Sequence, residues 1–452
     1  MKLVKSLLLG SAAGFAAVAG AQAADLPMTK AAPVDYVRVC SVHGAGFFYI
    51  PGSDTCIKIG GRVRAEFQYQ EPLNNGAGEG RYRDATGFRG RGQLDVDART
   101  SSEWGTVRAF FRFQLTRDSG VYRATYAGPQ NSVTNSNLDK AFIQFAGFTA
   151  GVAQSFFDFY AESLNWGTAN GVLPGSDQGA TQLLAYTATF GSGFSATISI
   201  EDRNQRAIAG GVATPRGYYN VYDSAGQRMP DVVGVLRVDQ GWGSAQLSGV
   251  VRQLNSGLLD YNYGNFVGTS RVDNKYGYAV QAGVKINLPM LAAGDQLWLE
   301  AAYAEGALSY LGVTGSPQVG GLAGYLPVSD YVIPTYAAVA NDPYATGGIK
   351  LTKGWNVLGA FLHYWTPSLR STLWGSYTAV DYPGQVVAGG VYRDFKVFQA
   401  ASALIWSPVK AMDIGVEVLY AKYDAKRNWA TPVGLKGSED QWQGRIRFQR
   451  DF

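Results

Sequence analysis

Apolar and polar residues alternate along residues 56–70 for longer than in most strands of soluble proteins. The residues of one parity are apolar and those of the other are polar or charged: Ile57, Ile59, Val63, Ala65, Phe67 and Tyr69 against Lys58, Arg62, Arg64, Glu66, Gln68 and Gln70. Successive side chains of a β-strand point to opposite faces. This pattern therefore predicts a strand with one apolar face and one charged face.

The same period recurs along the chain and predicts sixteen strands. Their expected ranges are 56–70, 88–100, 104–117, 137–146, 147–155, 181–190, 193–203, 230–239, 242–254, 274–287, 295–304, 350–365, 368–380, 392–406, 410–422 and 440–452. Most have the roughly 9–11 residues that a tilted strand needs to cross a bilayer. In 392–406 the expected apolar face carries Phe395, Val397 and Ile405, and in 410–422 it carries Ile414 and Val418.

The links between these segments are short and long in turn. Short links follow every second segment, as at 191–193 and 366–368, and the longest link covers 305–349. Outer-membrane barrels have short periplasmic turns and long extracellular loops. The sequence therefore predicts an all-β fold, a 16-stranded antiparallel transmembrane β-barrel. Its apolar faces would meet lipid and its charged faces a water-filled lumen.

The composition agrees with a membrane barrel. The chain has 57 Gly, 27 Tyr, 22 Phe and 10 Trp, and only 16% of its 452 residues are charged. Its mean hydropathy of −0.08 resembles that of a soluble protein, as expected when only alternate residues of each strand meet lipid. The formal net charge of +4 gives no reason to expect nucleic acid as a partner.

The first 23 residues have the features of a cleaved signal peptide. Lys2 and Lys5 precede the apolar stretch 7–18, and Ala21-Gln22-Ala23 is a small-residue cleavage site. We therefore expect three regions, which are a signal peptide over 1–23, an N-terminal periplasmic segment over 24–55 and the barrel over 56–452.

The chain contains two cysteines, Cys40 and Cys56. In an exported chain such a pair predicts a disulfide, here within the periplasmic segment. Free thiols and a metal site that includes His43 are the alternatives. Two Cys and one His are fewer than the four usual ligands of structural zinc, so we expect neither a metal nor a cofactor.

One long link, residues 155–180, differs from the others. It starts with five aromatic residues among residues 155–166 and then becomes rich in glycine. A loop exposed to water has no need of so many aromatics, whereas a loop folded into the barrel does. We therefore expect 155–180 to be a constriction loop, with Asp158, Glu162 and Asp177 as acids at the narrowest point.

Basic residues on the inward parity of the first three strands would form the opposite wall. These residues, called the basic ladder, are Lys58, Arg62, Arg64, Arg89, Arg91, Arg99, Arg108 and Arg112. A basic ladder that faces loop acids would set a transverse field across the pore and favour hydrophilic solutes. The alternative is a solvated lumen face on which Glu66, Asp95 and Asp97 pair with some of the arginines.

The sequence gives little support for catalysis. His43 and His363 are the only histidines, and no serine motif accompanies either of them. Asp95 and Asp97 lack the glycine and the later glutamate of a calcium loop. We therefore expect a channel and not an enzyme.

The predicted periplasmic segment and the start of the predicted barrel resemble a known family, and the layout of the whole mature chain is similar to it. Asp35-Tyr-Val-Arg-Val-Cys40, Gly44-Ala-Gly-Phe-Phe-Tyr-Ile-Pro-Gly-Ser-Asp-Thr-Cys56 and Ile57-Lys-Ile-Gly-Gly-Arg-Val-Arg64 are similar to the alphaproteobacterial general porins. The resemblance implies a homotrimer in the outer membrane of a Gram-negative cell that passes small hydrophilic solutes. It also implies contact with outer-membrane lipid and lipopolysaccharide.

The last strand ends on Phe452, which resembles the signal read by the barrel-assembly machinery. The function expected from residues and resemblance together is passive diffusion of small hydrophilic solutes and ions. A substrate-specific channel for sugars or anions is the alternative, followed by a plugged structural barrel.

Overall fold

The computed structural model describes residues 38–72, 84–123, 131–160, 164–168, 172–177, 179–208, 211–213, 226–262, 265–314, 328–334, 349–383, 393–426 and 437–452. The predicted signal peptide and Glu162 lie outside these residues. In the part that is described, no helix has the length and apolar character needed to span a bilayer.

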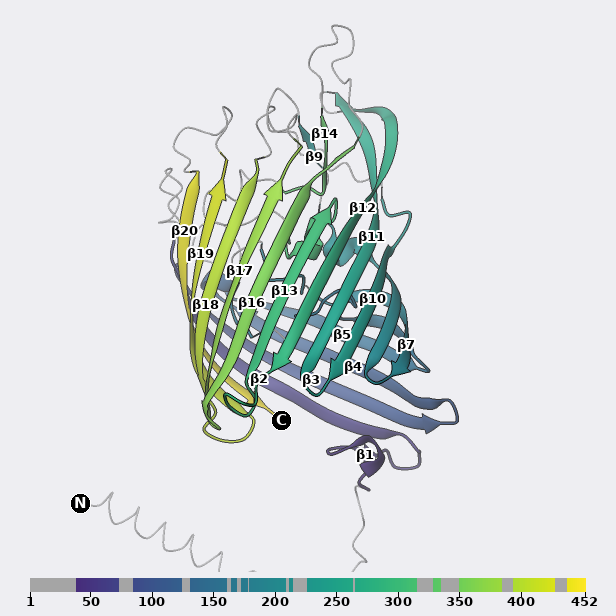
Figure 1. The fold of residues 1–452 in the computed structure, drawn as a ribbon, viewed down its shortest axis with the longest axis vertical. Coiled ribbons are helices and arrows are strands. Elements are labelled where there is room, and N and C mark those ends of the chain that lie inside the picture. Colours follow the sequence, from purple (N-terminus) through teal and green to yellow (C-terminus); the bar gives the residue numbers. More distant parts are fainter. Residues whose placement is uncertain are drawn as a thin grey trace, which may run out of the picture.

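Sixteen strands of the described chain form one closed antiparallel sheet (Figure 1). They are β2 (Cys56–Gln70), β3 (Thr86–Ser102), β4 (Gly105–Asp118), β5 (Val133–Phe145), β6 (Phe148–Ala153), β7 (Thr181–Gly191), β8 (Phe194–Glu201), β10 (Asp231–Gln240), β11 (Gly243–Asn262), β12 (Asn265–Asn287), β13 (Gln296–Glu305), β16 (Lys353–Thr366), β17 (Leu369–Asp381), β18 (Phe395–Trp406), β19 (Met412–Ala425) and β20 (Ser438–Asp451). Each strand pairs with the next, and β20 pairs with β2. The predicted 16-stranded barrel is confirmed.

The shorter elements precede β2 or lie between the barrel strands, and β1 pairs with the start of β2. They are β1 (Phe48–Tyr49), β9 (Gly211–Ala213), β14 (Tyr331–Pro334), β15 (Lys350–Leu351) and the 3-10 helices η1 (Ser41–His43), η3 (Gly120–Arg123), η4 (Arg203–Arg206) and η5 (Leu308–Leu311). β9, β14 and β15 form a separate small sheet.

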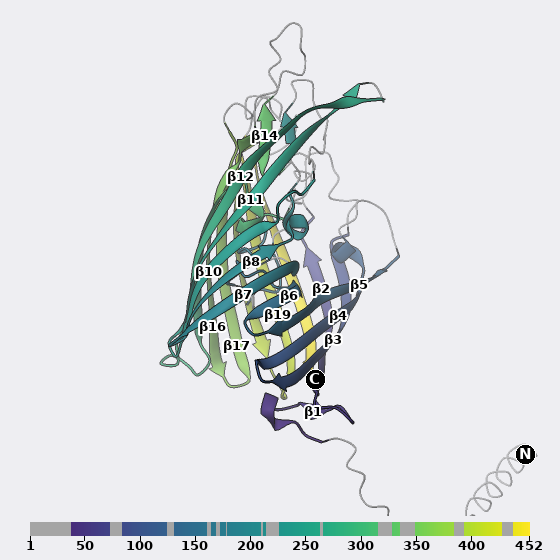
Figure 2. The ribbon, with the colours of Figure 1, turned by 90° about the vertical axis from the view of Figure 1, so that its right-hand side faces the viewer.

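The connections sort the barrel into a short-turn end and a long-loop end. Both β1 and the C-terminus lie at the short-turn end in two perpendicular views (Figures 1 and 2). The sequence predicted a loop over 255–273, between the ninth and tenth strands, and this is wrong. In the structure β11 continues to Asn262 and β12 begins at Asn265. This hairpin rises beyond the other strands (Figure 2). A strand pair outside lipid needs no apolar face, so hydrophobic alternation could not reveal it.

The outward faces of the strands expose large apolar side chains. Ile198, Leu236 and Leu247 are 60%, 59% and 55% exposed, respectively. An exposed apolar surface of this kind is unfavourable in water and favourable in contact with lipid. The expected parity is wrong for β18, where Phe395, Val397 and the other odd residues are buried and most of the even ones are exposed. The reason, which is a packed layer inside the barrel, is described below.

A disulfide joins Cys40 to Cys56, with their Cα atoms 6.0 Å apart, as predicted. His43 lies near both sulfurs, but these sulfurs are bonded to each other and are not free thiolate ligands. Phe47 packs in a small buried cluster with the two cysteines. The Arg99 guanidinium lies 4.8 Å, and the Lys58 amine 6.0 Å, from the centroid of the Phe47 ring.

The barrel closes where Phe452 meets β2. The backbone N–H and C=O groups of Gly61 and Phe452 exchange two hydrogen bonds of 3.0 Å. A Cβ atom at Gly61 would lie 2.6 Å from the Phe452 ring and 2.3 Å from the carbonyl oxygen of Gln93. Gly61 therefore leaves the space that the terminal ring occupies.

We expect Gly61→Val to impair closure of the barrel, since overpacking of this kind destabilises by about 1–3 kcal/mol. The measurement is the fraction of heat-modifiable, folded barrel after refolding into detergent. Gly92→Val is the control, because a Cβ at Gly92 meets nothing within 4 Å. Equal refolding of the two variants would contradict this account of closure.

Candidate functional site

The described part of the link between β6 and β7 lies inside the barrel. Its described residues 155–160, 164–168 and 172–177 are called the inner segment. Three glutamates of the wall, called the anchoring glutamates, accept its backbone N–H groups. Glu201 of β8 accepts from Phe156 at 3.2 Å, Glu300 of β13 accepts from Tyr160 at 3.2 Å, and Glu417 of β19 accepts from Trp166 at 2.7 Å.

The second half of the inner segment returns along the same wall. The Asn356 side chain of β16 donates to the Pro174 carbonyl at 3.1 Å, and the Gln399 side chain of β18 donates to the Val172 carbonyl at 3.2 Å. Leu173 donates its N–H to the carbonyl of Gly312, just after η5, at 2.7 Å. Both halves are thus attached to the strands from β8 to β19.

Apolar packing fills the space between the inner segment and this wall. The rings of Phe157 and Tyr310 are 4.6 Å apart, and those of Phe159 and Trp298 are 5.3 Å apart. The same buried cluster contains Val397 and Ala401 of β18. The inward face of β18 is therefore apolar because it meets packed side chains and not water.

Buried charges connect the inner segment to the neighbouring loops. Arg206 of η4 forms a 2.6 Å ion pair with Asp158 and donates to the Ser176 carbonyl at 3.0 Å. Arg252 of β11 pairs with Asp231 at 2.6 Å and with Asp330 at 3.1 Å. The side chains in these three ion pairs are at most 1% exposed, so the links are not weakened by bulk water.

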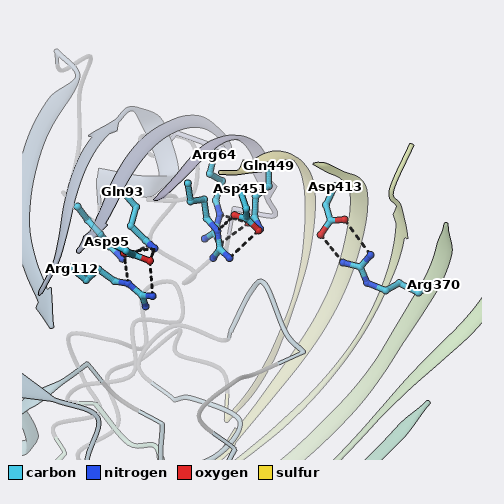
Figure 3. A network of polar contacts seen from close by, with 10 residues as sticks. Arg64, Gln93, Asp95, Arg112, Arg370, Asp413, Gln449 and Asp451 are labelled. Carbon is cyan, nitrogen blue, oxygen red and sulfur yellow. Dashed lines mark hydrogen bonds and ion pairs between the residues drawn. The ribbon is translucent and has the colours of Figure 1, made fainter. Parts of the chain in front are cut away.

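All eight residues of the basic ladder share the inward parity of β2, β3 and β4. Five of them pair with acids, which are Arg62 with Asp451 (2.6 Å), Arg89 with Asp118 (2.7 Å), Arg99 (2.8 Å) and Arg108 (2.9 Å) with Asp97, and Arg112 with Asp95 (2.8 Å). Figure 3 shows the Arg112–Asp95 pair, and also Arg370 with Asp413 farther around the wall. Much of the ladder's charge is therefore balanced on its own wall.

The remaining ladder residues are Lys58, Arg64 and Arg91. Arg64 donates to the side-chain oxygen of Gln449 at 2.9 and 3.1 Å (Figure 3), and Arg91 donates to the Thr116 hydroxyl at 3.0 Å. These partners are neutral, so the charges of Arg64 and Arg91 are not balanced by them.

The two described acids of the inner segment do not lie in the same environment. Asp158 is buried against Arg206, whereas Asp177 is only partly buried. The Gln154 side chain donates to both carboxylates, at 2.5 Å to Asp158 and 2.8 Å to Asp177. Loss of water around its carboxylate raises the pKa of Asp177 to about 8, and the charge of Asp158 adds to the rise, while Arg206 and Lys140 oppose it.

We expect the ion preference of the pore to change with pH because of Asp177. The side chain is neutral below its pKa and negative above it. One charge ~8 Å away in water favours a cation and disfavours chloride by about 0.5 kcal/mol each, so cation permeability relative to chloride should rise roughly fourfold from about pH 7 to about pH 9. Reversal potentials in a salt gradient measure this ratio. Asp177→Asn should remove the step, and a step that persists in this variant would contradict the assignment.

The sequence profile of the porin subfamily matches residues 25–446. The chain belongs to the porin subfamily. Porin Omp2b of Brucella suis is 27% identical over 470 residues, which cover 99% of this porin and 100% of that protein. Porin Omp2b of Brucella abortus (strain 2308) is 34% identical over 251 residues, which cover 55% of this porin and 65% of that protein.

Among solved structures, the outer membrane channel DcaP of Acinetobacter baumannii has a similar fold. The TM-score is 0.61 at 19% identity, with 89% of this porin and 99% of that chain covered. The porin is a general diffusion channel of the outer membrane, and its family is not enzymatic. The expected family, location and broad function are therefore confirmed.

Several residues that shape the lumen of this porin were missed by reasoning from its sequence. They are the anchoring glutamates and Arg206 and Arg252, together with two residues of β20. Of these two, Arg445 donates to the Trp166 carbonyl, and Arg447 pairs with Glu66 at 2.5 Å. One sequence signal was present, because Glu300 lies on the inward parity of β13 between the apolar residues Trp298 and Ala302. An isolated buried acid needs a hydrogen-bond donor, and here the donor is the backbone of the inner segment.

Proposed function

We propose that solutes cross this porin through a water-filled passage between the inner segment and the basic ladder. The observation that carries the proposal is the unequal filling of the lumen. The wall from β10 to β19 is covered by packed apolar side chains, whereas the ladder side chains of β2, β3 and β4 are partly exposed. Residues 155–180 act as the constriction loop in this proposal.

The roles of the site residues follow from their surroundings. The basic ladder sets the electrostatic character of the passage, with its unbalanced members contributing most. Asp177 adds a charge that depends on pH. Asp158 holds the inner segment to η4 and does not face the ladder, since its partner Arg206 is buried beside it.

We also propose a homotrimer. β6 contains only Phe148–Ala153, which is shorter than the roughly 9–11 residues of a membrane-crossing strand. Two outward apolar residues, Phe148 of β6 and Tyr186 of the neighbouring β7, are about half exposed. A neighbouring subunit would cover this low part of the wall. Residues 1–23 would be removed on export, and Phe452 would serve in recognition by the assembly machinery.

Single-channel recording in a planar bilayer tests the passage and the trimer together. We expect stepwise openings in groups of three, and uptake of small sugars but not of large ones by liposomes that contain the protein. A folded, heat-modifiable barrel without conductance would overturn the proposal and favour a plugged structural barrel. Single, ungrouped steps would overturn only the trimer.

A further inference from the structure

The inward side chains of β20, β2, β3 and β4 lie in rows, because paired residues of neighbouring strands stand side by side. The central row consists of Gln449, Arg64, Arg91 and Thr116. The row on its long-loop side consists of Arg447, Glu66, Arg89 and Asp118, and the row on its short-turn side consists of Asp451, Arg62, Gln93 and Gln114.

The two flanking rows are electrically balanced. Arg447 pairs with Glu66 at 2.5 Å, Arg89 pairs with Asp118 at 2.7 Å, and Arg62 pairs with Asp451 at 2.6 Å. Every arginine of these rows thus has a carboxylate of its own.

The central row has two adjacent arginines and no acid. Among the residues that the structure describes, no carboxylate oxygen lies within 4.0 Å of the side-chain nitrogens of Arg64 or Arg91. The next residue in this row beyond Gln449 is Asp413, which pairs with Arg370 at 2.6 Å. The row therefore carries two positive charges between neutral neighbours.

Both guanidinium groups retain hydrogen-bond donors for a ligand. Each has five N–H groups, and the described contacts use two of them on Arg64 and one on Arg91. Both side chains are partly exposed, and neither is among those with buried, unpaired nitrogen atoms. Arg64 projects from the wall beside Gln449 (Figure 3).

We propose that Arg64 and Arg91 together bind small oxyanions, with inorganic phosphate as the probe. The proposal rests on the porin function proposed above and adds a specific site to it. Two cross-strand neighbours have Cβ atoms about 4.5–5.5 Å apart. Arg64 leans toward Gln449 and Arg91 toward Thr116, so a tetrahedral anion between them would accept hydrogen bonds from the N–H groups that these contacts leave free. A guanidinium fork matches two oxygens of an oxyanion, whereas chloride offers one atom. Phosphate should therefore stay longer and obstruct the flow of chloride.

The test is chloride current through single channels as phosphate is added. We expect millimolar phosphate to lower the current of the wild type in a saturable way. Arg64→Gln and Arg91→Gln should each raise the half-blocking phosphate concentration about tenfold, as for loss of one charge-assisted contact. Arg64→Lys should also weaken the block, because it keeps the charge but loses the fork.

Arg62→Gln is the matched control, because it removes the same charge two residues away but from a balanced row. A half-blocking concentration within about twofold of wild type supports the site, and a shift equal to that of Arg64→Gln overturns it. Wild-type channels that pass chloride but ignore phosphate would overturn the site and leave the porin function intact. If no chloride current were seen, the porin function would fail, and phosphorus NMR line broadening with the folded barrel in detergent would decide the site.

Discussion

Replacing Arg252 by Met should lower the free energy of unfolding of the porin by about 3–5 kcal/mol, which is the usual effect of removing one partner from a buried ion pair. Asp231 and Asp330 would keep their charges in a place from which water is excluded. Arg252 also donates to the Arg206 carbonyl at 3.0 Å and to the Ser309 hydroxyl at 3.2 Å. Loss of all these contacts should release the loops that contain η4 and η5.

Thermal unfolding followed by heat-modifiability in gels measures this effect, and limited proteolysis detects released loops. Arg237→Met is the matched control, since the Arg237–Asp239 pair is 38% and 55% exposed and should contribute less than about 1 kcal/mol. Combining Arg252→Met with Asp231→Asn and Asp330→Asn should restore part of the lost stability. If the triple variant were no more stable than Arg252→Met, lost packing and not unbalanced charge would be the cause.

The barrel could be predicted because lipid imposes a simple rule on each strand. Outward positions at the level of lipid are mostly apolar and every second residue points outward, so the period located the strands. Cys56–Gln70 was predicted with the bounds that the structure has. The alternation of short and long links added the antiparallel order.

The interior could not be predicted to the same degree because inward side chains meet two different environments, water on one wall and packed apolar side chains on the other. Inward residues of β2 and β3 meet water and are charged, whereas Phe395 and Val397 of β18 meet the buried apolar cluster. The alternation in 392–406 locates a strand but does not say which face lies outside. That choice depends on where the inner segment folds, which is a contact between parts of the chain far apart in sequence.

The same limit applies to the acids of the inner segment. The sequence shows that Asp158 is an acid in an aromatic loop, but its partner Arg206 lies 48 residues away in another loop. A charge balanced within a buried pair contributes little to the field in a pore. The residue types therefore predicted that charged side chains line the pore. Which of these charges act on the solute depends on the ion pairs, and these could not be read from the sequence.

Removing two anchoring glutamates, in the variant Glu300→Ala with Glu417→Ala, should widen the pore and make its current unsteady. Glu300 supports both halves of the inner segment, because it accepts from the N–H of Tyr160 and lies against Gly175. Glu417 accepts from Trp166 near the middle of the segment. Each lost hydrogen bond to a carboxylate is worth about 1.5–3 kcal/mol. The conformation in which the inner segment is attached to the wall should therefore lose most of its free-energy advantage over detached conformations.

Single-channel conductance and current noise measure this change, and liposome swelling shows whether larger sugars now enter. The variant Glu300→Gln with Glu417→Gln retains an oxygen that accepts the same hydrogen bonds, so it should stay closer to wild type. Glu305→Ala is a control for loss of a glutamate at the barrel rim, where Lys353 is a distant partner at 3.8 Å. If the double alanine variant kept the conductance and sugar cutoff of the wild type, the inner segment would not form the narrowest part of the pore. Equal effects of the alanine and glutamine pairs would instead mean that the negative charges act on the solute directly.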